Sequence, residues 1–139
     1  MIIIDTNVFS EYMSAAPAPA VERWRAVIRA SDVYLTTVTR AEIRQGIAML
    51  PPGRRRDAVK ERADRVLEML AARTLAFDAV AADRYGEIVA ERARRGRPIA
   101  VLDAQIAAIA ASHHASVATR DSGGFEGTGV HVINPWSAG

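Results

Sequence analysis

The chain opens on an apolar run, Met1 to Ile4, that ends abruptly at Asp5-Thr6-Asn7. Because the run is β-branched and has no polar alternation, it predicts a strand covered on both faces, as in the middle of a parallel sheet. Ligands of open α/β sheets bind in the crevice at the carboxyl ends of the strands. Asp5 therefore stands where chemistry is usual, although Asp5, Thr6 and Asn7 are all good caps for a following helix as well.

Composition narrows the class of protein. A chain of 139 residues, half of them hydrophobic, is long enough for one folded domain, which we place at residues 1–139. It contains no cysteine, so a disulfide framework and a thiolate metal site are excluded and any metal needs oxygen or histidine ligands. The N-terminus lacks a basic segment before an apolar one, and no stretch approaches the roughly 18 apolar residues of a membrane span. These features predict a cytoplasmic protein.

Strand and helix patterns alternate along the chain. This order predicts an α/β fold in which helices cover both faces of a central, mainly parallel five-stranded sheet. Strands are expected at 1–4, 33–38, 74–77, 116–118 and 130–133, and helices at 8–13, 20–30, 39–50, 56–72, 79–94 and 98–113.

Two further carboxylates have local explanations beside a functional one. Glu42 ends the pattern Thr39-Arg40-Ala41-Glu42, a capping box in which the Glu reaches back to the Thr amide. Asp121 follows the fourth strand just as Asp5 follows the first, but Ser122-Gly123-Gly124 after it is typical of an Asx turn. Local sequence leaves both readings open for each residue.

Asp103 is harder to explain by local structure. It lies in an apolar, alanine-rich helical segment, well inside the helix predicted from Pro98, and has no Lys or Arg three or four residues later. A carboxylate beside an apolar seam is costly unless something cationic meets it. We therefore interpret Asp103 as a site residue.

Chain topology brings these four carboxylates together. The first and fourth strands of a parallel sheet point their carboxyl ends to one edge, which places Asp5 near Asp121. Glu42 follows the second strand by about one helical turn, and Asp103 lies on the helix before the fourth strand. Such a cluster suits Mg²⁺ or Mn²⁺, hard cations that prefer oxygen ligands and keep several waters.

Basic charge is nearly all arginine, because Lys60 is the sole lysine. The net charge is only +2, from 18 basic and 16 acidic residues. If the four carboxylates are withdrawn into one site, the remaining surface is clearly positive. Arginine binds phosphate through two parallel hydrogen bonds, so this excess favours a nucleic acid partner.

Four segments in order resemble the acidic motifs of the PIN domain: Asp5-Thr6-Asn7, TRAEIRQGIA around Glu42, PIAVLDAQIAAIA around Asp103, and VATRD ending at Asp121. Within that family the chain resembles VapC-type toxins of bacterial toxin–antitoxin pairs, particularly a FitB-like subgroup whose members also tend to end in Asn-Pro-Trp. The similarity covers essentially the whole chain.

The resemblance implies a PIN-like three-layer α/β/α sandwich and an Mg²⁺- or Mn²⁺-dependent endoribonuclease. It also implies a homodimer and a toxin–antitoxin hetero-oligomer, in which a small antitoxin blocks the site and alone contacts DNA. The site it implies consists of Asp5, Glu42, Asp103 and Asp121, with Asn7 and Thr119 in support; Asp5 and Asp103 are the expected metal ligands, joined by Asp121 directly or through water.

Three other interpretations share some of these sequence features. A haloacid dehalogenase-like phosphatase or a phospho-receiver domain also begins with a strand ending in Asp, but both use a lysine, and Lys60 lies in an arginine-rich helix. A third reading keeps the fold and makes the protein a catalytically weak binding module of a repressor complex. We expect His113, His114 and His131 to be exposed or capping residues, Trp24 and Trp136 to be packing residues, and Ala107, Ala108 and Ala111 to form a helix surface for close packing in a dimer.

Overall fold

The computed structural model describes residues 1–137 and is built on a five-stranded sheet in the order β3-β2-β1-β4-β5. Every neighbouring pair of strands is parallel, so the predicted α/β class and the five strands are confirmed. The strands are β1 (Ile2–Ile4), β2 (Val33–Thr36), β3 (Thr74–Leu75), β4 (Ser116–Ala118) and β5 (Val132–Ile133).

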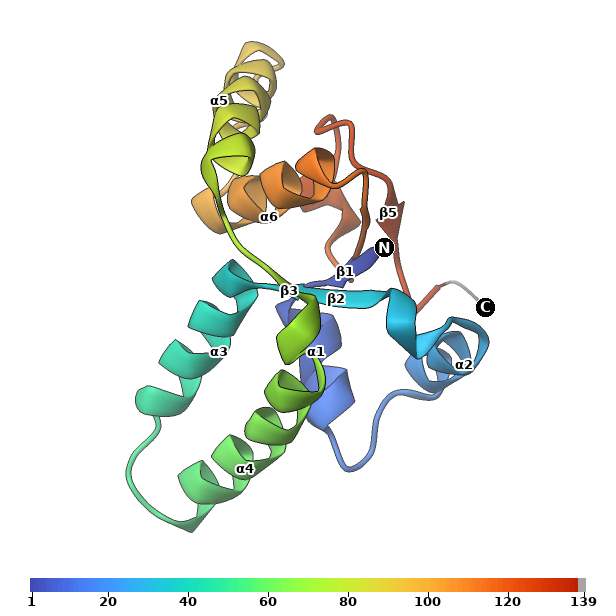
Figure 1. Ribbon diagram of the computed structural model, residues 1–139, viewed down its shortest axis with the longest axis vertical. Helices are drawn as coiled ribbons and strands as arrows, with labels where there is room; N and C mark the ends of the chain where they lie inside the picture. Colours follow the sequence, from blue (N-terminus) through green and yellow to red (C-terminus); the bar gives the residue numbers. More distant parts are fainter. Residues whose placement is uncertain (138–139) are drawn as a thin grey trace.

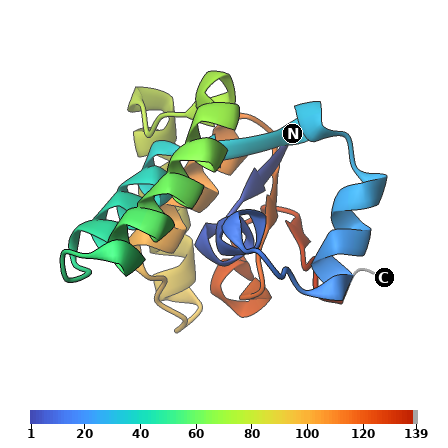
Figure 2. The same cartoon turned by 90° about the horizontal axis from the view of Figure 1, so that it is seen from below.

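Helices cover both faces of the sheet. In Figure 1, α1, α3 and α4 lie below the strands and α5 and α6 above them, while Figure 2 shows α1 and α4 in front of the strands and α2 to one side. The helices are α1 (Thr6–Met13), α2 (Pro19–Val27), α3 (Thr37–Ala48), α4 (Arg54–Met69), α5 (Ala79–Arg94) and α6 (Val101–Ser112), with short 3₁₀ turns at Ala30–Asp32, Ala71–Arg73 and Ser122–Phe125.

The sheet separates two hydrophobic cores. Successive side chains of a strand point to opposite faces, and in β1 Ile4 packs into the core beneath α1 and α4 while Ile3 packs into the core beneath α5 and α6. Both side chains are fully buried. This two-sided burial explains why the first strand is a continuous apolar run.

Helix α3 begins earlier than the sequence predicts, and the predicted capping box is wrong. The N-cap is Thr36, whose hydroxyl accepts a hydrogen bond of 3.1 Å from the Thr39 amide. Thr39 is therefore inside the helix and fully buried. Glu42, which the capping box would have turned back onto its own helix, is available to reach another element.

Helix α6 begins later than predicted, at Val101 rather than Pro98. The Arg97 amide donates to the Arg92 carbonyl at 2.9 Å, and the Arg97 carbonyl accepts from Arg92 Nε at 2.6 Å, which holds this segment outside the helix. Asp103 consequently lies in the first turn of α6. Its placement well inside the helix was wrong, and the helix dipole favours a negative charge where it actually lies.

Predictions for the remaining residues divide by burial. His113 forms the C-cap of α6, while His114 and His131 are exposed, as expected. Ala107 and Ala108 are fully buried in the core on the α5 side and Ala111 is partly buried against it, so the predicted alanine surface for a dimer is wrong. Within residues 1–137, no helix is long and apolar enough to cross a membrane.

Candidate active site

Asp5 serves as a helix cap and as a member of the acidic site at once. Its Oδ1 accepts a hydrogen bond of 2.8 Å from the Thr6 amide at the start of α1, and its Oδ2 accepts one of 3.0 Å from the Thr119 hydroxyl after β4. The residue is only 8% exposed. Burial raises the pKa of Asp5, while these two hydrogen bonds partly lower it.

Thr119 joins the ends of β1 and β4. While its hydroxyl donates to Asp5, it accepts from Asn7 Nδ2 at 3.3 Å and from the Asp121 amide at 3.1 Å, which uses its one donor and both acceptor positions. Asn7 Oδ1 in turn accepts from the Arg120 amide at 3.1 Å. Asn7 and Thr119 therefore lie at the acidic site and fix the chain that leads to Asp121.

Glu42 enters the site from α3 through a contact that the sequence did not predict. Its Oε1 accepts a hydrogen bond of 3.1 Å from the Thr6 hydroxyl. Burial raises the pKa of Glu42, the Thr6 hydrogen bond lowers it, and the nearby charge of Asp5 raises it further. Thr6 was considered only as a cap, yet it holds both Asp5 and Glu42.

Asp103 and Asp121 face the same small space beside Gly124. A Cβ atom at Gly124 would lie 3.0 Å from Asp121 Oδ2 and 3.2 Å from Asp103 Oδ2. Asp121 Oδ1 accepts from the Gly124 amide at 3.3 Å, so the predicted turn is present while Oδ2 of the same carboxylate faces the space beside Asp103. Any residue other than glycine would crowd the two carboxylates.

The four carboxylates repel one another most strongly at Asp103. Burial raises the pKa of Asp103 to about 6, helped by the charges of Asp5, Asp121 and Glu42 and opposed by Arg92. No hydrogen bond within residues 1–137 engages the Asp103 carboxylate. The structure thus brings all four predicted residues into one electrostatically strained cluster.

Arg92 is the important residue that the sequence reasoning missed. It is 5% exposed, and its guanidinium donates at 2.9 Å each to the carbonyls of Gly124 and Glu126, in addition to Arg97. It therefore holds the loop that carries Gly124 and offsets part of the charge on Asp103. A signal was available: Arg92 continues the apolar stripe of Ala81, Tyr85 and Ile88 on α5, where a surface arginine does not belong.

Comparison with known proteins identifies the fold family. The family model described as PIN domain matches residues 2–129. The chain is 42% identical over 137 residues to the VapC ribonuclease Y4jK of Sinorhizobium fredii, covering 98% of each protein, and 40% identical to Toxin FitB of Neisseria gonorrhoeae, covering 98% of this chain and 99% of that one. The chain belongs to the PIN-domain family.

Structural similarity agrees with this assignment. A chain in the solved structure of FitAB bound to an IR36 DNA fragment has a TM-score of 0.91 and 40% identity to this PIN domain, covering 98% of this chain and 96% of that one. The PIN-like three-layer sandwich predicted from the sequence is confirmed.

The donor set of this PIN domain fits a hard divalent cation. Asp103 Oδ2 and Asp121 Oδ2 both face the space that a Cβ at Gly124 would fill, and the surrounding carboxylates supply only oxygen. Among the residues that the structure describes, however, no three acidic or histidine side chains stand in a geometry that would hold a metal by themselves. Mg²⁺ commonly binds one or two carboxylates and keeps its waters. The predicted trio of Asp5, Asp103 and Asp121 is thus not preassembled and remains a proposal.

Proposed function

We propose that this PIN domain is the toxin of a type II toxin–antitoxin pair and an endoribonuclease that hydrolyses RNA phosphodiester bonds with Mg²⁺ or Mn²⁺. The observation that carries the proposal is the acidic cluster itself. Four carboxylates gather there, from the N-cap of α1, from α3, from α6 and from the segment after β4, and burial together with the other three charges raises the pKa of Asp103 to about 6. A fold does not maintain such repulsion for stability, so the cluster is a candidate cation site.

A divalent cation held there would supply positive charge against the developing charge on phosphorus and make water a better nucleophile. Asp5 and Asp103 are the proposed direct ligands, and Asp121, which faces Asp103 beside Gly124, would join directly or through water. Asp5 is fixed by the Thr6 amide and the Thr119 hydroxyl, so its position does not depend on the ligand.

Glu42 has a separate proposed role. Because the Thr6 hydroxyl donates a hydrogen bond to Oε1 of Glu42, the carboxylate is held in place and its other oxygen has a fixed direction. A carboxylate of raised pKa beside the cluster can accept a hydrogen bond from an attacking water and take its proton. We assign Glu42 to that orientation step.

The similarity to toxins crystallised with partner proteins supports a cognate antitoxin of the VapB or FitA kind for this chain. The FitAB structure and one VapBC structure are bound to DNA, and we propose that DNA is contacted here only through the antitoxin. The proposed homodimer needs a surface other than the buried alanines of α6. Val80, Val101 and Leu102, at the starts of α5 and α6, are 58%, 59% and 42% exposed and are the available apolar side chains in that region.

The test is cleavage of end-labelled RNA of several classes, including transfer RNA, by the purified protein. We expect cleavage with Mg²⁺ or Mn²⁺, loss of cleavage on adding chelator, and inhibition by the co-expressed product of the neighbouring gene. Cleavage that persists in chelator would refute the metal mechanism. A pure protein that binds its antitoxin but cleaves no RNA would instead support the binding-module reading.

A further inference from the structure

The ends of β4 and β5 lie side by side at the edge that carries the acidic site. The Thr119 amide donates to the Ile133 carbonyl at 2.9 Å, so the segments that follow the two strands start from adjacent positions. After β4 come Arg120 and Asp121, and after β5 comes Asn134-Pro135-Trp136. The C-terminal tryptophan is thereby brought to the rim of the acidic site.

Arg120 does not pair with the carboxylates next to it. Its guanidinium carbon lies 4.7 Å from the centre of the Trp136 ring, and within residues 1–137 no carboxylate lies within ion-pair distance of its guanidinium. This differs from Arg25, which lies over Tyr12 at 3.9 Å but also pairs with Glu22. Arg120 is exposed and lies in the chain between the buried Thr119 and Asp121, and its charge is not among those that shift the pKa values of Asp5, Glu42 and Asp103.

Trp136 is a fixed support for this cation. The Trp136 amide donates to Asn134 Oδ1 at 3.0 Å, Pro135 is buried, and the half-buried indole packs against the core beneath α1 and α4. The backbone of Arg120 is equally fixed, because its amide donates to Asn7 Oδ1. Attraction between a guanidinium and the face of an indole is strongest among the aromatic side chains.

We propose that Arg120, held on Trp136, is a phosphate-binding subsite for single-stranded RNA beside the scissile bond. A guanidinium that lies on a ring keeps its N–H edge free, and that edge binds phosphate through parallel hydrogen bonds. The proposal rests on the nuclease function proposed above. Arg120 lies within the region matched by the PIN-domain model, residues 2–129, whereas Trp136, which supports it, lies beyond that region.

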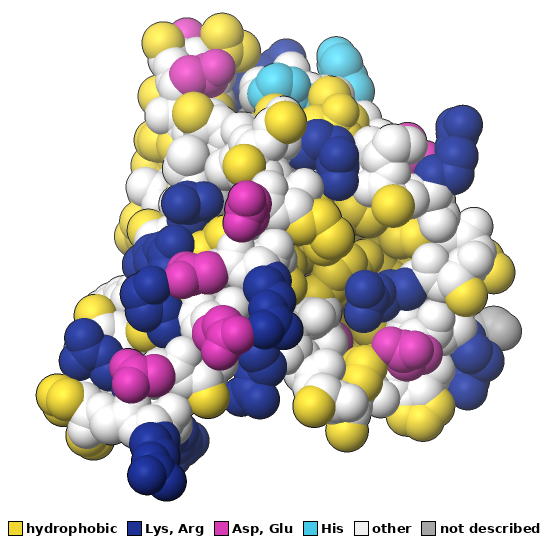
Figure 3. Space-filling view, turned by 60° about the horizontal axis from the view of Figure 1, so that its bottom comes forward, with side chains coloured by type: hydrophobic (Ala, Val, Ile, Leu, Met, Phe, Trp, Pro, Cys, Tyr) yellow, Lys and Arg dark blue, Asp and Glu magenta, His cyan; other side chains and the backbone are white. Residues whose placement is uncertain are grey.

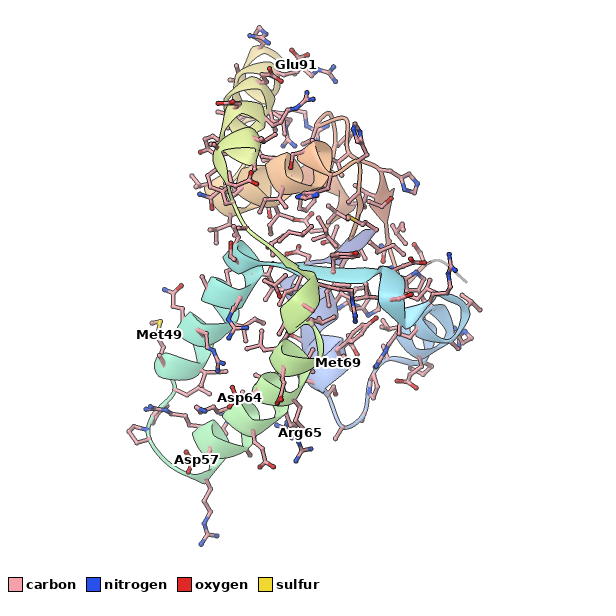
Figure 4. The ribbon with its side chains drawn as sticks, in the orientation of Figure 1. Met49, Asp57, Asp64, Arg65, Met69 and Glu91 are labelled. Atoms are coloured by element: carbon pink, nitrogen blue, oxygen red, sulfur yellow. The ribbon has the colours of Figure 1, made fainter. Side chains whose placement is uncertain are left out.

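The experiment measures binding of a fluorescent 12-nucleotide single-stranded RNA with hydrolysis-resistant phosphorothioate linkages, in Mg²⁺, across a series of salt concentrations. Arg120→Ala is expected to weaken binding about tenfold and to reduce the slope of log affinity against log salt by about 0.7, the value for one phosphate contact. The matched control is Arg55→Ala, which removes the same charge from the exposed start of α4, the end of the molecule marked by Asp57 in Figure 4. It should change binding by no more than about twofold.

Variants of Trp136 test whether this residue supports the Arg120 side chain or only packs against the core. Trp136→Ala is expected to weaken RNA binding as much as Arg120→Ala does, and the double variant should be no weaker than either one. If Trp136→Ala melts too low to be measured, Trp136→Phe replaces it. Because phenylalanine keeps a smaller ring face, this variant should lose about threefold, and the loss should vanish when Arg120 is already alanine.

Each outcome decides the proposal. Equal RNA affinity and salt slope for Arg120→Ala and Arg55→Ala would overturn it, even if the wild type cleaves RNA. If the wild type binds RNA but never cleaves it, and Arg120→Ala binds RNA tenfold more weakly, the result would support the subsite and refute the nuclease. If the wild type binds no RNA, both proposals are overturned. If Arg120→Ala weakens binding of a poly-glutamate peptide as much as it weakens binding of RNA, the assignment to RNA is overturned.

Discussion

The carboxylates of this protein occupy two opposite environments. On the outer helices they are paired: Asp64 of α4 binds Lys60 at 2.7 Å and also Arg44, and Glu91 of α5 binds Arg94 at 2.9 Å and Arg95 at 3.0 Å. These hydrogen bonds hold the pKa of Asp64 and that of Glu91 below their usual values. In the acidic site the pKa values of Asp5, Glu42 and Asp103 are raised instead.

The figures show how the two environments are separated. Asp64 lies on α4 and Glu91 on α5, on opposite sides of the sheet (Figure 4). On the face drawn in Figure 3, acidic and basic side chains stand next to one another. Three of the four ion pairs named above join residues that are three or four positions apart on one helix, where their side chains are neighbours. The members of the acidic site come from separate elements and form no ion pair within residues 1–137, and Arg92 offsets only part of their charge.

The largest expected effect is on catalysis. Asp103→Asn removes a charge from the unbalanced cluster and should lower the rate of RNA cleavage at least about 100-fold. Asp64→Asn removes the same charge from a paired helix surface and should leave the rate unchanged. Initial rates with Mg²⁺ or Mn²⁺ at pH 7 make the comparison. Equal rates for the two variants would remove the functional distinction between the environments.

The next effect concerns Arg92, the buried cation that faces the cluster. Arg92→Met leaves three carbonyl oxygens without their donor and should lower the free energy of unfolding by about 3 kcal/mol, or the melting temperature by about 10 °C. Arg84→Met removes an exposed arginine with one ion pair, and its melting temperature should stay within about 2 °C of wild type. Thermal melts followed by circular dichroism measure both. If Arg92→Met melts with the wild type, the loop at Gly124 is held by other contacts.

Metal should distinguish the environments by stabilisation. At a concentration one hundred times its dissociation constant, Mn²⁺ should stabilise the wild type by about 2.7 kcal/mol. Asp64→Asn should gain the same amount and Asp103→Asn much less, because only the acidic site binds the ion. Melting curves with and without Mn²⁺ provide the measurement. A full gain in Asp103→Asn would place the metal elsewhere.

The smallest effect is expected at the paired surface. Asp64→Asn breaks two exposed ion pairs and should change the melting temperature by no more than about 2 °C at low salt. The change should shrink further in 1 M salt, where charges are screened within about 3 Å. A larger shift that resists salt would mean that this surface is more strongly coupled than its exposure indicates.

Much of the fold could be predicted because the apolar patterns are strong. The run at residues 1–4 and the strand at 116–118 indicated the two strands that carry Asp5 and Asp121, and parallel topology then placed these residues at one edge. Helix boundaries were less accurate where a long-range contact decides them. The hydrogen bond from Arg92 to the Arg97 carbonyl holds the residues before α6 outside the helix. No local sequence pattern around Pro98 reveals this contact.

The four carboxylates of the acidic site could be predicted from the sequence, but the contacts that hold them together could not. Residue spacing pointed to four carboxylates, yet the hydroxyls that fix two of them come from Thr6 and Thr119, which act across 36 and 114 positions of the chain. Arg92 was not singled out from the other arginines, because charge alone does not reveal burial. Its position on the apolar stripe of α5 was the better signal.

The most direct test of the unbalanced cluster is the metal-free stability of Asp103→Asn from pH 4 to pH 7. Because the pKa of Asp103 is raised from 3.8 to about 6, the folded state favours its protonated form, and the associated stability is complete below pH 3.8 and is lost as the pH rises to about 6. Asparagine resembles the protonated acid at every pH. The variant should therefore match the wild type near pH 4 and exceed it by about 1–2 kcal/mol at pH 7, after allowance for screening by solvent. A variant that melts several degrees below the wild type at pH 7, with a difference independent of pH and with RNA cleavage intact, would show that Asp103 is a structural residue and that the acidic site is not the active site.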